Sequence, residues 1–247
     1  MSNIKMTLVN FENLKKFVLN SFLAMGLNKK DAEIFTDALM FSELRFHSGQ
    51  GQGVQRITTY FKRIKNNEVN INSEFEILKE SSSLALVDAK NGIGTIQASK
   101  CMDIAINKAK NEGIGKVIVK NSTHFGSSSV HAVKASKQNC IGIAYTNAGP
   151  EMAPWGSKSG GVGTNPWGIS CPTGKGFPLI LDIDLGEFWL LRTNFHWHGT
   201  DRPWRTRLGF GPKFAPNPLK TVRVPCWLFL RYYLLKGLIQ IPFGKAT

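Results

Sequence analysis

Apolar residues near the N-terminus recur every three or four positions, the period of an amphipathic helix. Asn10 can cap a helix that runs to about residue 24, and Asn28 can cap a second that ends in the stretch HSGQGQG. A third helix is expected over residues 53–65. These helices predict a helical N-terminal subdomain, residues 1–72. The apolar residues assigned to their inner faces are Phe11, Leu14, Phe17, Val18, Phe22, Ile34, Phe35, Ala38, Leu39, Phe41, Val54, Ile57, Phe61 and Ile64.

From residue 73 the pattern changes to short apolar runs alternating with helical segments, which predicts an α/β layer over residues 73–184. The order and direction of its strands stay open. A long Gly/Pro loop is expected over residues 148–168. The expected strands are FEILKE, LALVDA, the buried strand GKVIVKNS, IGIAYTN and FPLILDID, and the expected helices lie in NGIGTIQASKCMDIAINKAKNEG and STHFGSSSVHAVKASKQN.

The composition changes abruptly after residue 184. The net charge of +14 divides into +6 for residues 1–184 (21 Lys and Arg against 15 Asp and Glu) and +8 for residues 185–247 (10 against 2). The latter segment also holds six of the eleven prolines and four of the six tryptophans, without helical or strand periodicity. We therefore expect an irregular tail and an apparently truncated domain, as a shifted reading frame would produce; the alternative is a basic extension with its own role.

The remaining composition favours a cytoplasmic protein. No run of about 18 uncharged apolar residues could span a membrane, and the N-terminus lacks the apolar core of a secretory signal. The four cysteines are widely spaced, with no CxxC pair, so a zinc ribbon or a disulfide scaffold is disfavoured. Because more than half of the net charge of +14 lies in the tail, nucleic acid is not the expected partner.

His124 is the strongest single candidate for chemistry. It follows the apolar run Val117–Val119 and precedes a helix, the position at which ligands gather in α/β folds. An imidazole there can transfer a proton near neutral pH, and Ser127–Ser129 can cap the next helix. A buried histidine bonded to a backbone carbonyl is an equally good local interpretation. As a control, a substitution of His131, one turn into that helix, is expected to leave turnover nearly unchanged.

The glycine-rich turn HSGQGQGVQR gathers His47, Gln50, Gln52 and Arg56. Arg56 could hold a carboxylate through two parallel hydrogen bonds, although a solvated turn with a surface arginine is the commoner outcome. The glycines do not form a dinucleotide fingerprint, because a helix and not a strand precedes them. His196 and His198 have no neighbouring carboxylate or cysteine, so no metal site is expected.

Five segments, in order, resemble the type 2 malate/L-lactate dehydrogenase family, NAD(P)-dependent 2-hydroxyacid oxidoreductases related to ureidoglycolate and sulfolactate dehydrogenases. The resemblance covers about residues 8–184. It implies a non-Rossmann, mixed-sheet cofactor domain and a homodimer with its active site near the subunit interface. The segments are ELRFHSGQGQGVQRITTY, NGIGTIQASKCMDIAINKAKNEGIGKVIVKNSTHFGSS, IGIAYTNAGPEMAPWG, GTNPWGISCPT and PLILDID.

The resemblance also implies site roles. His124 falls on the acid/base histidine of the family, and Arg56 and Tyr60 fall on its substrate-binding residues. Gln52 stands where relatives carry a histidine, for which His47 could compensate. The positions that match cofactor contacts are Ala148 (often Ser in relatives), Gly163, Thr164, Asn165, Asp182, Ile183 and Asp184.

The function implied is hydride transfer between NAD or NADP and a small 2-hydroxy (or 2-imino) acid. Two alternatives remain open at the level of sequence. The chain could be an inactive, truncated or frame-shifted member of the family. It could also be a binding module that uses a basic tail.

Overall fold

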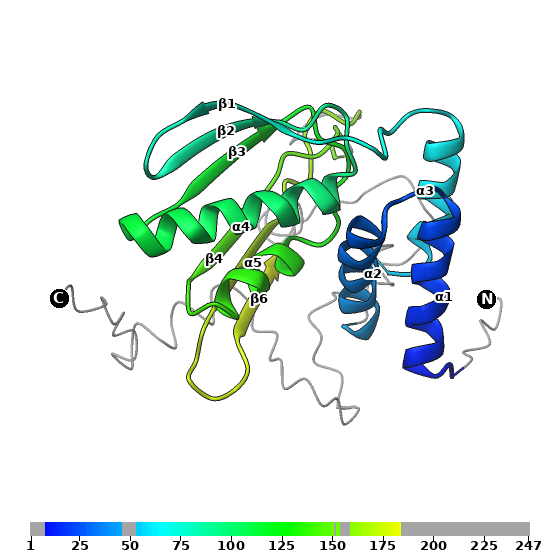
Figure 1. Ribbon diagram of the computed structural model, residues 1–247, viewed down its shortest axis with the longest axis horizontal. Coiled ribbons are helices and arrows are strands. Elements are labelled where there is room, and N and C mark those ends of the chain that lie inside the picture. Colours follow the sequence, from blue (N-terminus) through cyan, green and yellow to red (C-terminus); the bar gives the residue numbers. More distant parts are fainter. Residues whose placement is uncertain (1–7, 46–52, 151, 154–158, 184–247) are drawn as a thin grey trace.

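The computed structural model describes residues 8–45, 53–150, 152–153 and 159–183, and all structural statements concern these residues. The fold is mixed α/β, as the sequence predicts. Three helices lie on one side of the molecule, and two three-stranded sheets with two further helices lie on the other (Figure 1). The predicted basic tail and the residues His47, Gln50, Gln52 and Asp184 lie outside the described residues.

The first two helices begin at the predicted caps. In α1 (Phe11–Ala24) the side chain of Asn10 accepts the amide N–H of Asn13, and in α2 (Lys29–Leu44) Asn28 accepts that of Asp31. Each cap satisfies a backbone donor that the first helical turn leaves unpaired. The third helix, α3 (Arg56–Lys65), begins three residues later than expected, so that Arg56 is its first residue.

The inner faces of these helices differ from the predicted ones at several aromatic residues. Val18, Phe22 and Phe35 are buried as expected, but Phe17 is 60% exposed and Phe61 is 52% exposed. In α3 the buried aromatic residue is Tyr60, at 2% exposure. The helical period alone admits either neighbour, and packing against α2 selects Tyr60, whose ring meets the edge of Phe35 at 4.6 Å between centroids.

The strands form two separate sheets. In the first, β1 (Glu76–Glu80) pairs antiparallel with β2 (Leu84–Asp88), which pairs in parallel with β3 (Lys116–Lys120). In the second, β4 (Gly142–Tyr145), β5 (Trp167–Cys171) and β6 (Leu179–Ile183) are antiparallel neighbours in chain order. The mixed first sheet and antiparallel second sheet agree with the expected mixed-sheet fold.

Two strand predictions were wrong. The expected strands omit β5, the central strand of the second sheet, and the expected Gly/Pro loop covers its first two residues, 167 and 168. The run Val117–Val119 was expected to be fully buried, but Ile118 is 51% exposed. Side chains alternate along β3, so that Val117 and Val119 lie on its partly buried face and Ile118 lies on the opposite face, which stays exposed among the described residues.

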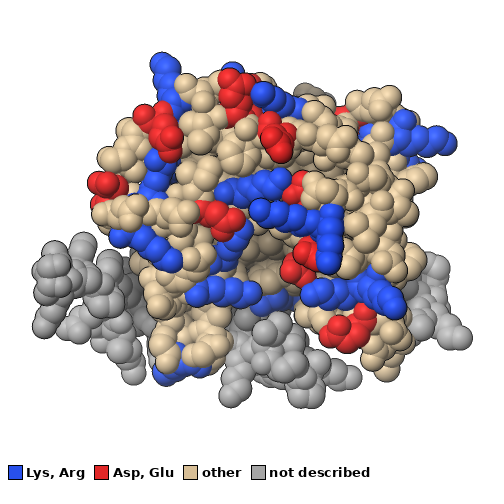
Figure 2. Space-filling view, in the orientation of Figure 1, with Lys and Arg blue, Asp and Glu red and all other residues tan. Residues whose placement is uncertain are grey.

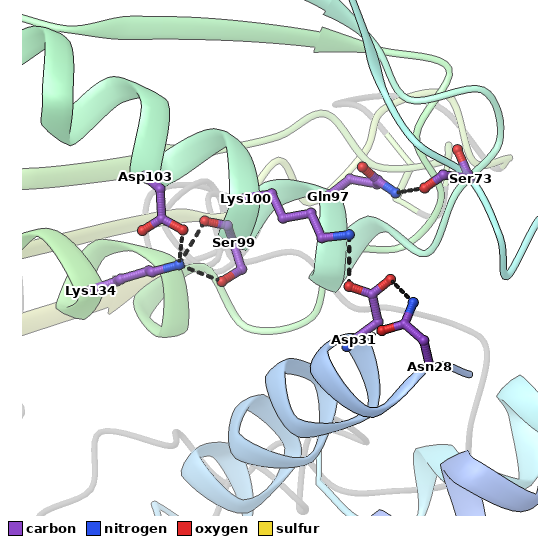
Figure 3. Close-up of polar contacts among 8 residues, drawn as sticks. All are labelled: Asn28, Asp31, Ser73, Gln97, Ser99, Lys100, Asp103 and Lys134. Atoms are coloured by element: carbon purple, nitrogen blue, oxygen red, sulfur yellow. Dashed lines mark hydrogen bonds and ion pairs between the residues drawn. The ribbon is translucent and has the colours of Figure 1, made fainter.

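The long helix α4 (Gly94–Glu112) joins the other elements, whereas α5 (Ser128–Ser136) covers one face of the second sheet. Close to its start, Gln97 donates to the carbonyl of Ser73 at 2.9 Å, and Lys100 pairs with Asp31 of α2 at 2.7 Å (Figure 3). One turn further, Asp103 pairs with Lys134 of α5 at 2.6 Å. The helix therefore fixes the helical part and both sheets relative to one another.

The hydrophobic core is shared between the helical part and the beginning of α4. Its buried members include Phe22 and Phe35, whose rings stack at 4.3 Å, together with Ile93 and Ile96 at the α4 N-terminus. On the face in Figure 2, Lys and Arg side chains are interspersed with Asp and Glu. Among the described residues, no helix is long and apolar enough to cross a membrane.

Candidate active site

The structure brings Tyr60 and His124, which are far apart in sequence, into direct contact. The Tyr60 hydroxyl lies 3.0 Å from Nδ1 of His124 and 3.0 Å from the backbone carbonyl oxygen of the same residue. The two rings are 6.4 Å apart between centroids. Tyr60 thereby continues the aromatic packing of the helical core up to the loop after β3.

The backbone around His124 is held by the N-terminus of α4. The amide N–H of Gly94 donates to the Thr123 hydroxyl at 3.0 Å, and that hydroxyl donates to the carbonyl of Gly92 at 2.9 Å. A Cβ atom at Gly94 would lie 2.1 Å from the Thr123 carbonyl oxygen and 2.6 Å from that of His124. Glycine is therefore required there, because only its backbone can approach the His124 segment so closely.

The surroundings of His124 favour the neutral imidazole. Burial, and then the positive charges of Arg56 and Arg63, lower the pKa of His124 to about 4. Nδ1 also accepts the amide N–H of Gly126 at 3.3 Å. A backbone amide can only donate, so this bond favours the neutral form with its proton on Nε2.

Arg56, Tyr60 and Arg63 share one face of α3. Their spacing of four and then three residues places them within about 60° of one another around the helix axis. Both arginines are half-buried. Because Tyr60 touches His124, the structure places two guanidinium groups on the helix face that carries the imidazole contact.

Asp182 lies at the N-terminus of α5, where it replaces the predicted serine cap. Its Oδ2 accepts the hydroxyls of Ser127 and Ser129, each at 2.5 Å, and the amide N–H of Ser129 at 3.3 Å. The carboxylate thus satisfies a free amide at the positive end of the helix dipole. Ser127 holds the N-cap position without bonding a helix amide itself, so the cap comes from a residue 53 positions away.

The other residues assigned to the cofactor gather at one end of the second sheet. Asn165 accepts the amide N–H of Ala148 through Oδ1 at 2.9 Å, and Gly163 packs against the Ala148 carbonyl, where a Cβ would lie at 2.3 Å. Two residues after Asn165, Trp167 pairs with Ile183 in the β5–β6 register. The position of Asp182 connects this end of the sheet to the His124 loop through Ser127.

The described part of the chain does not place His47, Gln50, Gln52 or Asp184. Thr164 is half-buried in the loop beside Asn165. No group of three or more His, Cys, Asp or Glu side chains that could hold a metal ion occurs in the described ranges. The thiol of Cys101 is no candidate nucleophile, because burial raises its pKa to about 12.

His131 is a structural residue that the sequence did not distinguish. Its Nε2 lies 2.8 Å from the carbonyl of Phe125, its ring stacks on that of Phe125 at 5.0 Å, and it is 1% exposed. Burial lowers its pKa to about 4. This burial gives His131 a role in packing, and the expectation that its substitution leaves turnover nearly unchanged stays a prediction.

Comparison with known proteins shows which family shares the sequence motifs of this chain. The family model described as malate/L-lactate dehydrogenase matches residues 9–186. The chain belongs to the malate/L-lactate dehydrogenase family. It is 37% identical over 172 residues to a malate dehydrogenase of Pyrococcus abyssi and 36% identical over 172 residues to an L-sulfolactate dehydrogenase of Methanocaldococcus jannaschii. These matches cover 70% of this chain and 47% and 49% of the two relatives.

Solved structures of this family share the fold of the described residues. The malate dehydrogenase of Pyrococcus horikoshii matches with a TM-score of 0.68 and 35% identity, over 71% of this chain and 50% of the other. That of Entamoeba histolytica matches with a TM-score of 0.69 and 32% identity, over 77% and 54%. The chain therefore spans about half the length of the malate/L-lactate dehydrogenase relatives that it matches.

Proposed function

We propose that the chain carries the proton-transfer and substrate-binding half of an NAD(P)-dependent 2-hydroxyacid oxidoreductase. The contact between Tyr60 and His124 beside Arg56 is the observation that supports this proposal most strongly. Relatives named for malate and sulfolactate support a small 2-hydroxy acid as the substrate class. The reaction is hydride transfer between C2 of that acid and a nicotinamide ring.

In this proposal His124 moves the proton of the C2 hydroxyl at Nε2. Nδ1 faces Tyr60 and Gly126, so Nε2 is the nitrogen left for the substrate. An anionic substrate beside Arg56 offsets part of the charge that lowers the His124 pKa. The pKa then rises toward the neutral range, in which an imidazole both accepts and returns a proton.

Tyr60 is a positioning residue whose hydroxyl can change its hydrogen-bond acceptor when the tautomer of His124 changes. When Nε2 carries the proton, Nδ1 accepts hydrogen bonds from the Gly126 amide or the Tyr60 hydroxyl. When Nε2 is free to act as a base, Nδ1–H donates to the Tyr60 oxygen while Tyr60 donates to the His124 carbonyl. The imidazolium formed after proton uptake keeps that second arrangement, so Tyr60 stabilises it.

Arg56 holds the C1 carboxylate of the substrate. A guanidinium presents two parallel N–H donors to a carboxylate, which fixes the direction of the C2–H bond as well as binding the charge. Positioning of this kind lowers the barrier by holding the reacting atoms close together before the step occurs. His47 and Gln52, in the preceding turn, remain candidate substrate contacts.

The residues proposed for the nicotinamide cofactor include an exposed stretch of backbone, which supports their assignment. Ala148 and the adjoining Gly149 are exposed, and a Cβ at Gly149 would meet nothing within 4 Å. These residues, with Gly163–Asn165, Asp182 and Ile183, would hold the cofactor, and Asp184 would extend the set. Bound there, the cofactor accepts or gives the hydride.

Asp182 does not act on the proton in this proposal. Its carboxylate orients Ser127 and Ser129 and thereby the loop between His124 and α5. We further propose that the active chain works in the cytoplasm as a homodimer, with neither a membrane nor a nucleic acid as partner.

Fluorescence titration of the purified chain with NADH and NADPH tests this function. Binding of either nucleotide, with enhanced nicotinamide emission, supports the proposed dehydrogenase function.

The second candidate is that the chain is an inactive member of the family. The family match, which ends at residue 186, favours this candidate. Failure to bind either nucleotide, with the fold intact by circular dichroism, would favour that candidate.

A further inference from the structure

Arg63 lies where its guanidinium could bind a second anionic group on the substrate, in addition to the carboxylate assigned to Arg56. It follows Arg56 by seven residues and Tyr60 by three, so it lies one turn beyond Tyr60 on the helix face that carries the His124 contact. The Cα atoms of Arg56 and Arg63 are about 10 Å apart along α3, with Tyr60 between them. Two long guanidinium side chains can converge from that separation on a molecule of a few carbon atoms.

Within the described ranges, the Arg63 guanidinium has no carboxylate counterion. It is half-buried, and none of the ion pairs or side-chain hydrogen bonds among the described residues involves it. Its charge still acts on the site, since it adds to the lowering of the His124 pKa and opposes the rise that burial causes in the Tyr60 pKa. Partial burial of a cation costs desolvation free energy, and a bound anion can offset that cost where no carboxylate of the protein does so.

Other cations of α3 do not share this position. Lys62 and Lys65 are exposed and lie on the opposite side of the helix, about 120° and 180° from Arg56 around its axis. The first carboxylate that follows the helix in the sequence, that of Glu68, accepts the side-chain amide of Asn66. The arrangement therefore separates two inward arginines from two outward lysines on one short helix.

We propose that Arg63 is a specificity residue that selects substrates with a second anionic group, so that the site takes a 2-hydroxy acid carrying two negative charges in preference to one carrying a single charge. This inference rests on the proposed function, since it assigns the C1 carboxylate to Arg56. Arg56 then sets binding of every 2-hydroxy acid, and Arg63 sets the preference among them. A guanidinium suits the second group whether it is a carboxylate or a sulfonate, because both offer two oxygens.

The test measures binding without turnover. The full chain is titrated with malate and with lactate by calorimetry at low ionic strength, and the side-chain ¹⁵N signals of His124 report whether each acid reaches the site. We expect malate to bind at least about tenfold more tightly than lactate, since one added charge-assisted bond has that effect. Arg63→Gln should remove this preference and leave lactate binding unchanged. Arg56→Gln should weaken both acids.

Lys62→Gln is the matched control, because it removes the same charge from the outer side of the same helix. It should leave the preference for malate intact, and none of these variants should change the melting temperature by more than a few degrees. Equal affinities for malate and lactate in the unaltered chain would overturn the role of Arg63 and leave the proposed function standing. A preference that survives Arg63→Gln, or that Lys62→Gln removes equally, would also overturn it. If neither acid binds or moves the His124 signals, the proposed substrate site itself fails.

Discussion

The hydroxyl of Tyr60 lies 3.0 Å from both Nδ1 and the carbonyl oxygen of His124. One hydroxyl therefore has two acceptors on the same residue, and the tautomer of the imidazole decides which of them receives its proton. The contact couples α3 of the helical part to the loop after β3, so two segments that are far apart in the sequence lie side by side.

Tyr60→Phe should remove this coupling with little change in packing. Nδ1 then keeps only the Gly126 amide as a partner, so we expect His124 to hold its proton on Nε2 more completely. Side-chain ¹⁵N shifts of His124 measure the tautomer directly. The loss of the buried hydroxyl should lower the free energy of unfolding by about 1 kcal/mol. Unchanged ¹⁵N shifts would show that Tyr60 does not control the tautomer.

Acid should destabilise the fold through its two buried histidines. The pKa of each is about 4 in the folded chain and about 6.5 in the unfolded chain. Between these values the unfolded state binds more protons, so the free energy of unfolding falls as pH falls from about 6.5 to about 4. Each histidine contributes a slope of about 1.4 kcal/mol per pH unit in that window.

His131→Gln isolates one of these contributions in urea unfolding at a series of pH values. A glutamine amide can still donate to the Phe125 carbonyl, but it does not titrate. Between pH 4.5 and 6, we expect the free energy of unfolding of His131→Gln to change less steeply with pH than that of the unaltered chain. The difference in slope should equal the contribution of one histidine, about 1.4 kcal/mol per pH unit. An unchanged slope would mean that His131 protonates in the folded state near its ordinary pKa.

The local signals in the sequence are sufficient for the starts of α1 and α2. Asn10 and Asn28 act within three residues of themselves, so the cap can be recognised without the tertiary structure. The same holds for the end of α4, where Gly113 takes a left-handed conformation at φ 80°. Bonds of this kind depend on the nearest neighbours in the chain, and the sequence displays those neighbours.

Features that depend on distant partners could not be predicted in this way. Tyr60 and Phe61 fit the inner face of a helix about equally well, and only Phe35 and His124 decide between them. The cap of α5 comes from Asp182, which no local pattern joins to Ser129. The family resemblance did place Arg56, Tyr60 and His124 in one site, but it did not indicate that Tyr60 bonds both Nδ1 and the carbonyl of His124.

Asp182→Asn should weaken the start of α5. The substitution removes the charge at the helix N-terminus and replaces an acceptor of two hydroxyls, so we expect a loss of about 2 kcal/mol in the free energy of unfolding. Asp103→Asn is the control, since its exposed ion pair with Lys134 should contribute less than about 1 kcal/mol. Equal effects of the two substitutions would refute the capping role.

Gly142→Ala should destabilise the second sheet. A Cβ there would lie 2.1 Å from the carbonyl oxygen of Ala132 in α5, so helix and sheet would have to separate. We expect a cost of about 1–3 kcal/mol in chemical denaturation. Gly149→Ala, where a Cβ meets nothing within 4 Å, should be tolerated. Similar stabilities for the two variants would contradict the close packing of α5 on β4.

The most direct test of the account is the turnover of His124→Ala beside the unaltered chain, with a 2-oxo acid and reduced nicotinamide cofactor. We expect kcat to fall by roughly 10²–10⁴-fold, the usual contribution of a positioned acid or base. The Kd for cofactor should change little, because His124 acts on the substrate proton. Near-full turnover by His124→Ala, or no turnover by the unaltered chain under conditions in which it binds cofactor, would contradict the account.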